Sequence, residues 1–333
     1  MDRSAGADII AVVQEKGGVG KTTTVINLGA WYARLGRRTL LIDLDPQGNL
    51  AKGLGLTVPG GAMYRIFRDP AFPLEQAILP TEIPNLDLAG ADNGLEAAEI
   101  ELIHALSRES VLRRKIEASA VTRRYDRILL DCRPSLGVLT VNGMVAADRL
   151  LIPVETQYFA LEALQTLLDV VKTVQETLQP QLRIAGIVPT KHEARVRVCQ
   201  VTLSLLRERY PEHLTSTVIR KFVAFPEAQL RGVPTYSVAP GSDAAAAYRA
   251  LALELDGTPA GGPAPEKRPA NGTARRRETA PPAPGNGRAT GSRVVQMTQP
   301  SLPLEHAAQL TPSRAGRGAR EGAHRKAERD RRR

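Results

Sequence analysis

The chain has 333 residues, with 45 Lys+Arg against 35 Asp+Glu, so its formal net charge is +10. Its two cysteines, Cys132 and Cys199, lie far apart in the sequence, which argues against a disulfide scaffold, a thiolate zinc site and an iron–sulfur cluster. No apolar run approaches the roughly 18–20 residues that span a bilayer, and the N-terminal segment lacks the pattern of a signal peptide. The sequence therefore predicts a soluble, cytoplasmic protein.

The positive charge is concentrated at one end of the chain. Residues 257–333 contain 16 basic and 6 acidic residues, 10 of the 24 prolines and no aromatic residue, whereas residues 1–256 contain 29 of each charge. A segment so poor in large apolar groups cannot offset the entropy lost on ordering. We therefore predict a folded, neutral body at residues 1–256 and a disordered, basic tail at residues 257–333.

Short apolar runs alternate with longer amphipathic stretches along the body. The runs predict strands at residues 8–13, 38–43, 86–91, 127–131, 149–154, 182–188 and 216–219. The stretches predict helices at about residues 22–35, 94–119, 138–146, 159–178, 196–209 and 244–254. Because most runs are continuously apolar, the strands are expected to be covered on both faces. The alternation predicts an α/β fold with a doubly wound, mostly parallel sheet.

The first predicted strand leads into an eight-residue segment that opens the first predicted helix, Lys16-Gly17-Gly18-Val19-Gly20-Lys21-Thr22-Thr23. Glycines let the backbone turn its N–H groups toward an anion, and a helix N-terminus adds donors without partners. The segment therefore predicts a phosphate-binding loop. Lys21 would reach the β- and γ-phosphates of a nucleotide, Thr22 would ligate Mg²⁺, and Thr23 would lie near the α-phosphate.

The loop departs from the usual P-loop pattern, whose first glycine would fall at Glu15, and it begins with a second lysine, Lys16. K-G-G-x-G-K-T-T is the deviant Walker A motif, and here the sequence resembles the ParA/MinD family of ATPases, which are P-loop NTPases of the SIMIBI type. This resemblance implies a homodimer that sandwiches ATP, in which Lys16 reaches the phosphates of the other subunit and Lys21 acts within its own. ATP would hold the dimer together and hydrolysis would release it.

Two carboxylates end the second predicted strand, Asp43 and Asp45, within the segment D-L-D-P-Q-G-N. Being two residues apart, they share one face of the strand at the carboxyl edge of the sheet, where α/β proteins bind ligands. The segment resembles switch I of ParA proteins. By that resemblance Asp45 positions the attacking water near the metal, Asp43 lies beside the metal and phosphates, and residues 47–49 respond to the γ-phosphate. The alternative is a polar loop in which Asn49 caps a helix.

A later predicted strand ends in Asp131, followed by Cys132, Arg133 and Pro134. Apolar residues followed by Asp form the Walker B layout, in which the carboxylate holds Mg²⁺ directly or through water. The alternative is a turn residue at a strand end. The ParA family usually reads D-C-P-P here, so Arg133 replaces a proline and a fixed φ is lost, which leaves the conformation of this loop open.

The resemblance continues through residues 138–148 and 153–162 and so covers most of the body. Tyr158 and Phe159 are interpreted as core or dimer-contact residues, and no residue is assigned to the adenine.

ParA proteins bind DNA without sequence preference, for which phosphate neutralisation by Lys and Arg suffices. Arg195 matches a basic position of the family's DNA-binding surface, and Lys221 aligns with an arginine. Ala224 replaces another arginine, and solvated charged loops are the alternative for both segments.

The tail carries basic clusters at residues 275–277, 325–326 and 331–333. A disordered basic arm would bind any duplex or an acidic partner, and the alternative is a solubilising extension. Its end lacks the apolar spacing of the membrane anchor in the MinD branch, so no membrane contact is expected.

The leading interpretation is a chromosome or plasmid partitioning ATPase that uses ATP and Mg²⁺. Its dimers would coat nucleoid DNA, and a ParB-like centromere-binding protein would stimulate hydrolysis and release them. Alternatives are a ParA-like ATPase that positions chemoreceptors, a microcompartment or cellulose machinery, a metabolic or metal-cluster P-loop protein, and a DNA-binding scaffold without hydrolysis. The missing cysteine pair argues against a cluster protein, the D-L-D-P-Q-G-N segment against a small-molecule ligase, and Lys21 and Asp45 against a scaffold.

Overall fold

The computed structural model describes residues 6–257, so all but the first residue of the predicted tail lies outside the described residues. Seven strands form one sheet in the order β3-β4-β2-β5-β1-β6-β7, and only the β3–β4 pair is antiparallel. The strands are β1 (Asp8–Val12), β2 (Thr39–Asp43), β3 (Ile78–Pro80), β4 (Leu86–Ala89), β5 (Arg127–Asp131), β6 (Arg149–Glu155) and β7 (Arg183–Thr190). The predicted α/β fold with a mostly parallel sheet is confirmed, with one antiparallel strand added at the edge.

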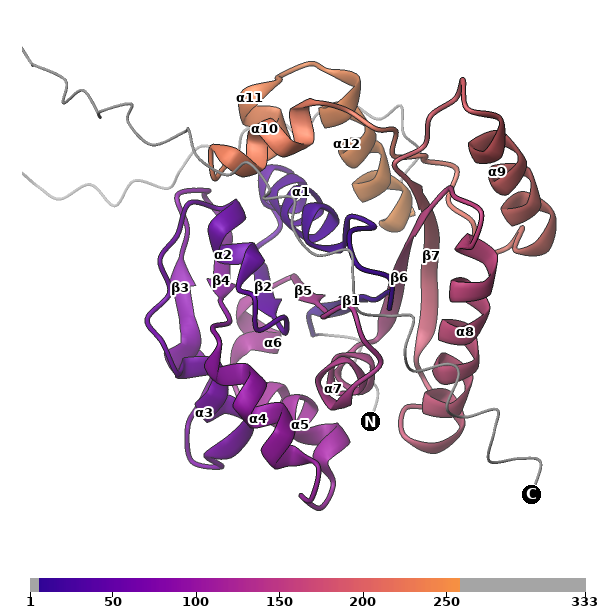
Figure 1. Ribbon diagram of the computed structural model, residues 1–333. Helices are drawn as coiled ribbons and strands as arrows, with labels where there is room; N and C mark the ends of the chain where they lie inside the picture. The colour runs from indigo at the N-terminus through magenta and orange to yellow at the C-terminus, as the bar shows by residue number, and fades with distance from the viewer. Residues whose placement is uncertain (1–5, 258–333) are drawn as a thin grey trace, which may run out of the picture. The chain divides into compact units, whose positions relative to one another are not determined.

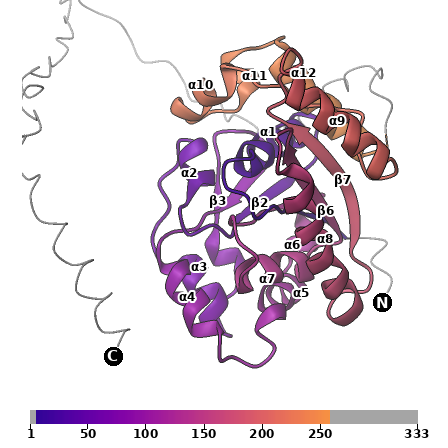
Figure 2. The same cartoon turned by 45° about the vertical axis from the view of Figure 1, so that its right-hand side comes forward.

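Helices cover both faces of the sheet (Figure 1 and Figure 2). On one face lie α1 (Lys21–Arg34), α2 (Asn49–Gly53) and α12 (Asp243–Leu255). On the other lie α3 (Ala62–Arg68), α4 (Gly94–Leu102), α5 (Val111–Ala118), α6 (Val121–Arg124), α7 (Val138–Ala146) and α8 (Ala160–Thr177). The remaining helices are α9 (Arg197–Arg209), α10 (Ala224–Leu230) and α11 (Thr235–Val238), with 3₁₀ turns at Leu74–Ala77 and Arg108–Ser110.

The central strands are buried on both faces, which explains their unbroken apolar sequences. In β1, Ile9 and Ala11 pack into the core beneath α3–α8, whereas Ile10 and Val12 pack into the core beneath α1 and α12. Since successive side chains of a strand point to opposite faces, both faces must be apolar when both are covered.

The predicted helix at residues 94–119 is wrong, because the structure divides it into α4, a 3₁₀ turn and α5. Ser107 lies at the break and has a φ of 52°, in the left-handed region. A left-handed residue ends the right-handed hydrogen-bond ladder, and only local polar contacts make it tolerable for a side chain other than glycine. Arg114 supplies one such contact, donating to the carbonyl oxygen of Ser107 at 3.3 Å.

The predicted strand at residues 216–219 is also wrong. The chain runs beside β7 there, and within residues 215–219 its backbone donates to β7 through the N–H groups of Thr215 and Ile219, at 3.0 and 2.8 Å. Between these points the N–H groups of residues 216–217 donate to the carboxylate of Glu254 on α12, at 2.6 and 3.0 Å. A side chain has therefore taken the donors that a regular parallel ladder needs.

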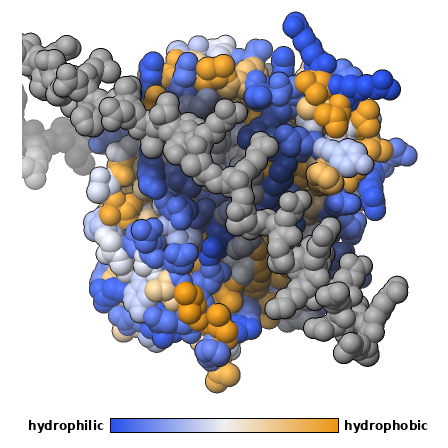
Figure 3. All heavy atoms as spheres, viewed as in Figure 1, coloured by the Kyte–Doolittle hydropathy of each residue, from blue (hydrophilic) through white to orange (hydrophobic). Residues whose placement is uncertain are grey.

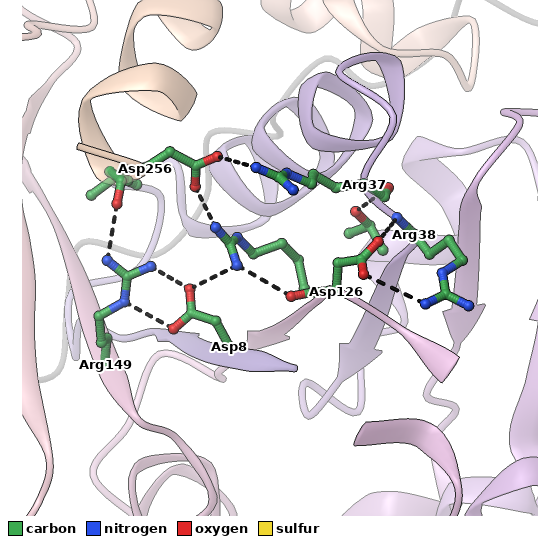
Figure 4. Close-up of polar contacts among 9 residues, drawn as sticks. Asp8, Arg37, Arg38, Asp126, Arg149 and Asp256 are labelled. Carbon is green, nitrogen blue, oxygen red and sulfur yellow. Dashed lines mark hydrogen bonds and ion pairs between the residues drawn. The ribbon is translucent and has the colours of Figure 1, made fainter. Parts of the chain in front are cut away.

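Charged side chains at the amino-terminal edge of the sheet join three strands to the last helix (Figure 4). Asp8 on β1 is ion-paired with Arg149 on β6, and its carboxylate lies 3.5 Å from Nη1 of Arg127 on β5. Nη2 of Arg127 donates to Asp256, the residue after α12, at 2.6 Å. This network fixes the end of α12 against the central strands.

Apolar side chains are exposed on two parts of the surface in Figure 3, over α4 with its following loop and over α9. The exposed residues there are Ile100, Ile103, Leu106, Val198, Val201 and Leu205.

None of the helices within residues 6–257 combines the length and the apolar composition that a membrane span requires.

Candidate functional site

The predicted phosphate loop, residues 16–23, connects β1 to α1 and begins that helix. Gly18 and Gly20 have φ angles of 75° and 97°, in the left-handed region that favours glycine. Gly20 is the N-cap of α1, and no side chain caps the helix. The first N–H groups of α1 therefore remain free of side-chain acceptors, as binding of an anion requires.

The side chain of Lys21 is buried inside this loop. Its Nζ donates to the carbonyl oxygen of Lys16 at 3.3 Å, so the ammonium lies across the turn that the glycines form. Burial lowers the pKa of Lys21, while the carboxylates of Asp131 and Asp45 act to raise it. Lys21 is thus a buried cation without an ion-pair partner of its own at contact distance among the described residues, which is suited to meeting a phosphate.

Asp131 lies at the carboxyl end of β5, buried next to the phosphate loop. Neither of its carboxylate oxygens has a well-formed hydrogen bond within residues 6–257. Burial raises the pKa of Asp131 to about 7, and the Thr22 hydroxyl and the Lys21 ammonium lower it in part. A buried carboxylate with free oxygens beside a hydroxyl fits Mg²⁺, which takes oxygen ligands and is usually held by one or two protein groups plus phosphates.

The two carboxylates after β2 have different surroundings. Asp45 lines the cavity at the phosphate loop, and its Oδ1 accepts the N–H of Gln47 at 3.1 Å. Asp43 is fully buried and accepts the N–H groups of Asp45 and Leu50, at 3.0 and 3.2 Å. Burial and the charge of Asp131 raise the pKa of Asp43. Asp43 therefore shapes the loop that presents Asp45, while its direct contact with a nucleotide stays a prediction.

A cavity of about 940 Å³ opens at this edge of the sheet and is large enough for a nucleotide. Gly18, Val19, Gly20, Lys21, Thr22 and Thr23 line its phosphate side, together with Asp45, Gln47, Asn49 and Pro134. The structure thus brings together the phosphate loop and Asp45, with Asp131 buried behind them.

The other side of the cavity is aromatic, and the sequence analysis assigned none of these residues. Phe222, Phe225 and Tyr248 line it. The Phe222 and Phe225 rings pack edge to face with centroids 5.8 Å apart, and Phe225 packs in the same way on Tyr248 at 5.6 Å. The Tyr248 hydroxyl lies 3.1 Å from that of Thr24 on α1, which joins the aromatic side to the phosphate side. The segment K-F-V-A-F-P held the only sequence signal, two aromatic residues directly after a basic pair.

Lys16 lies at the rim of the cavity and contacts two residues that the sequence analysis did not assign. Its Nζ is 3.0 Å from Glu155 Oε2 and 3.1 Å from Gln157 Oε1, both at the end of β6. Tyr158 and Phe159 follow and are 78% and 66% exposed, so their interpretation as core residues is wrong. Their role as dimer contacts stays a prediction.

The two predicted DNA-binding segments meet beside the same cavity. Arg195 is exposed just before α9, and Lys221 is exposed in the loop after residues 216–219. The segments are joined by a hydrogen bond from the Lys221 N–H to the carbonyl oxygen of His192, and by an ion pair of 3.1 Å between Lys221 and Glu193. Lys221 and Glu193 both line the cavity.

Comparisons with known proteins agree with this geometry. The model of an AAA domain family matches residues 7–184. The chain is 41% identical over 249 residues to the sporulation initiation inhibitor protein Soj of Bacillus subtilis, covering 74% of this chain and 97% of Soj. It is 39% identical over 249 residues to the chromosome partitioning protein ParA of Caulobacter vibrioides, covering 74% and 93%. The chain belongs to the ParA/MinD family of P-loop ATPases.

A solved structure supports the same assignment of the nucleotide site. Cobyrinic acid a,c-diamide synthase from Mycobacterium smegmatis, with a bound ATP analogue and magnesium, is 30% identical and superposes with a TM-score of 0.65 over 75% of this chain and 94% of its own. The chain is therefore a P-loop ATPase, and the cavity at its phosphate loop is the candidate site for the nucleotide. The family assignment also makes Arg133, which lies directly beside this cavity, a departure from the pattern D-C-P-P.

Proposed function

We propose that the protein is an ATP-dependent DNA-partitioning switch. A dimer that sandwiches ATP binds DNA without sequence preference, and a ParB-like centromere-binding protein stimulates hydrolysis and releases the dimer. One observation carries the proposal: Lys16 and the basic segments around Arg195 and Lys221 all border the cavity that would hold the nucleotide. Occupancy of this cavity can therefore influence both the dimer contact and the DNA contact.

In this proposal, hydrolysis uses the phosphate loop and the carboxylates beside it. The N–H groups at the start of α1 and the Lys21 ammonium hold the phosphates, and Asp45, which lines the same side of the cavity, orients the attacking water. Mg²⁺, held by Thr22 and Asp131 with Asp45 near it, would offset the charge that develops on the phosphate oxygens. Asp43 supports Asp45 by accepting its N–H.

Dimerisation would require Lys16 to change partners. In the single chain its ammonium is held by Glu155 and Gln157 at the cavity rim. Because this pair is partly exposed, it contributes little stability, and the phosphates of a second subunit would outcompete it. Glu155 therefore keeps Lys16 at the dimer-facing rim until the second subunit arrives.

The test is DNA binding by the full chain with no nucleotide, with ADP and with ATP, across a salt series. We expect tight binding only with ATP, and we expect Lys16→Ala to abolish the ATP effect, because that variant lacks the dimer contact to the phosphates. Lys172→Ala is the matched control, since among residues 6–257 Lys172 is ion-paired with Glu176 alone, on the surface of α8.

Two further results decide between interpretations. Equal DNA affinity in all three nucleotide states would contradict the switch. If ATP gates DNA binding but a ParB-like protein does not raise the hydrolysis rate, the ATPase would serve a different cargo.

A further inference from the structure

Position 133, in the loop between Asp131 and α7, is an arginine, where the pattern D-C-P-P has a proline. A proline would fix φ near −65° and so limit the conformations of the chain just after the metal-binding carboxylate. Arg133 has no such restriction. The loop nevertheless lies against the phosphate side of the cavity, where its conformation matters, so something else must hold it.

An ion pair with a neighbouring helix holds this position. The guanidinium of Arg133 is paired with the carboxylate of Glu99 on α4, and the two side chains are only 25% and 17% exposed. The carbonyl oxygen of Arg133 also accepts the N–H of Ser135 at 2.9 Å. Because the pair is partly buried, removing one partner leaves the other charge poorly solvated, which is costlier than losing a pair at the surface.

Glu99 touches the loop at a second point. A Cβ placed on Gly137, the last residue before α7, would collide with Glu99 Oε1, so the carboxylate lies directly over this backbone. One side chain of α4 therefore contacts both the beginning and the end of the segment 133–137. Figure 1 shows α4 and α7 on the same face of the sheet, where they pack together.

The loop reaches the phosphate side of the cavity through Pro134, and the connection into α4 reaches the loop that contains Asp45. Pro134, next to Arg133, lines the cavity, and its Cβ lies 3.9 Å from where a Cβ on Gly17 of the phosphate loop would be. The connection into α4 touches the loop that contains Asp45, since a Cβ on Gly48 would lie 2.8 Å from the carbonyl oxygen of Ala91. The Arg133–Glu99 pair thus joins the loop at residues 133–137 to α4, and the connection into that helix contacts the loop that contains Asp45.

We infer that Arg133 and Glu99 are positioning residues for ATP hydrolysis, and that their ion pair restricts this loop as a proline at position 133 would. The pair acts through Pro134 and Asp131 and does not touch the nucleotide. Arg133 Nε and Ser135 Oγ are buried without hydrogen-bond partners among residues 6–257, polar groups that the loop would satisfy when its surroundings close on a nucleotide.

The experiment measures basal ATPase activity of the full chain without DNA or partner, so its outcome does not depend on the partitioning role. We expect Glu99→Gln and Arg133→Ala to lower kcat by roughly threefold to tenfold and to raise the Mg²⁺ concentration needed for half-maximal rate. KM for ATP should change little, because the phosphate loop itself is intact. Arg133→Lys should retain most of the rate, since it keeps the charge.

The decisive comparison places Glu99→Gln in a chain that also carries Arg133→Pro. Proline restores the backbone restriction, so Glu99→Gln should have no effect on kcat in that background. An equal loss in both backgrounds, or an unchanged kcat and Mg²⁺ requirement in Arg133→Ala, would overturn the inference.

A control variant on the same helix separates positioning from general loss of stability. Glu101 on α4 pairs with Arg68 at 2.6 Å and does not contact the loop. Glu101→Gln should therefore leave kcat and the Mg²⁺ requirement unchanged. Thermal unfolding of each variant shows whether it is folded, and Glu99→Gln, alone and combined with Arg133→Pro, keeps the test decisive if Arg133→Ala is not.

Discussion

Phe222 lines the cavity together with Phe225 and Tyr248, and we expect the base of a nucleotide to lie against its ring. Its ring is held edge to face by Phe225, and the guanidinium carbon of Arg220 lies 5.7 Å from its centroid. Stacking of a base on an aromatic side chain contributes about 1–3 kcal/mol. We expect Phe222→Ala to weaken ADP binding by roughly tenfold, measured with a fluorescent ADP analogue.

The matched control for Phe222→Ala is Tyr158→Ala, which removes an exposed aromatic ring that does not line the cavity. ADP is the chosen ligand because the measurement then does not depend on dimer formation. Unchanged ADP affinity in Phe222→Ala would show that the base lies elsewhere in the cavity.

The residues that the sequence identified differ in kind from those it missed. The phosphate loop, Asp45 and Asp131 each belong to a short segment in which residue types at fixed spacing indicate the function. The end of one strand and the turn that follows it are therefore enough to find them. Glu155 and Tyr248 reach the same site from β6 and α12, more than a hundred residues away from the loop. No local sequence pattern predicts that these residues reach the site, because their positions depend on the order of the strands and on the packing of α12 against α1.

Most strands and long helices were predictable because burial on two faces leaves a strong apolar pattern. The exceptions are an element that is too short to give a pattern and elements whose first or last residue depends on a single polar contact. β3 is a three-residue edge strand that ends in a proline, too short to give a pattern. The break at Ser107 and the irregular chain at residues 216–219 depend on a backbone angle and on the Glu254 carboxylate, neither of which hydrophobic periodicity describes.

The ion network at the amino-terminal edge should stabilise the attachment of α12. Arg127 and Asp256 are 17% and 10% exposed, so their pair is screened less than a surface pair. We expect Asp256→Asn to lower the free energy of unfolding by about 1–2 kcal/mol, because Arg127 then lacks one of its two carboxylate partners. Chemical denaturation of the full chain measures this directly.

Glu176→Gln is the control for that prediction. It breaks the Lys172–Glu176 pair on α8, which spans 3.9 Å between strongly exposed side chains. Its effect on stability should be within about 0.5 kcal/mol of zero. Equal losses in the two variants would mean that the network around Arg127 is no stronger than a surface pair.

For the whole molecule, the charge distribution separates two contributions to DNA binding. Residues 1–256 carry no net charge, and all of the excess of +10 lies in residues 257–333. We expect a contribution from the charge of those residues in every nucleotide state, since Lys and Arg neutralise DNA phosphates without a need for ATP. We expect a chain that ends at Gly257 to bind DNA more weakly without nucleotide and to show a larger ratio of affinities between ATP and ADP.

The salt dependence of binding identifies the source of the change. Each DNA phosphate that the shortened chain no longer neutralises should reduce the slope of log affinity against log salt by roughly 0.9 for duplex DNA. If truncation leaves both the slope and the ATP-to-ADP ratio unchanged, residues 258–333 do not bind DNA. A full chain whose basic clusters at 275–277 and 331–333 are neutralised is the control for truncation itself.

Arg127 also brings the two ends of the folded body together. Because this single side chain reaches both Asp8 and Asp256, the beginning of the first strand lies next to the end of the last helix. The phosphate loop lies at the other end of β1, about 16 Å away. A linker of a few residues could therefore close the body into a circular permutant, with new ends opened in the exposed turn near Leu106. Attaching the basic segment at the new end near Leu106 would separate the effect of its charge on DNA binding from the effect of its place of attachment.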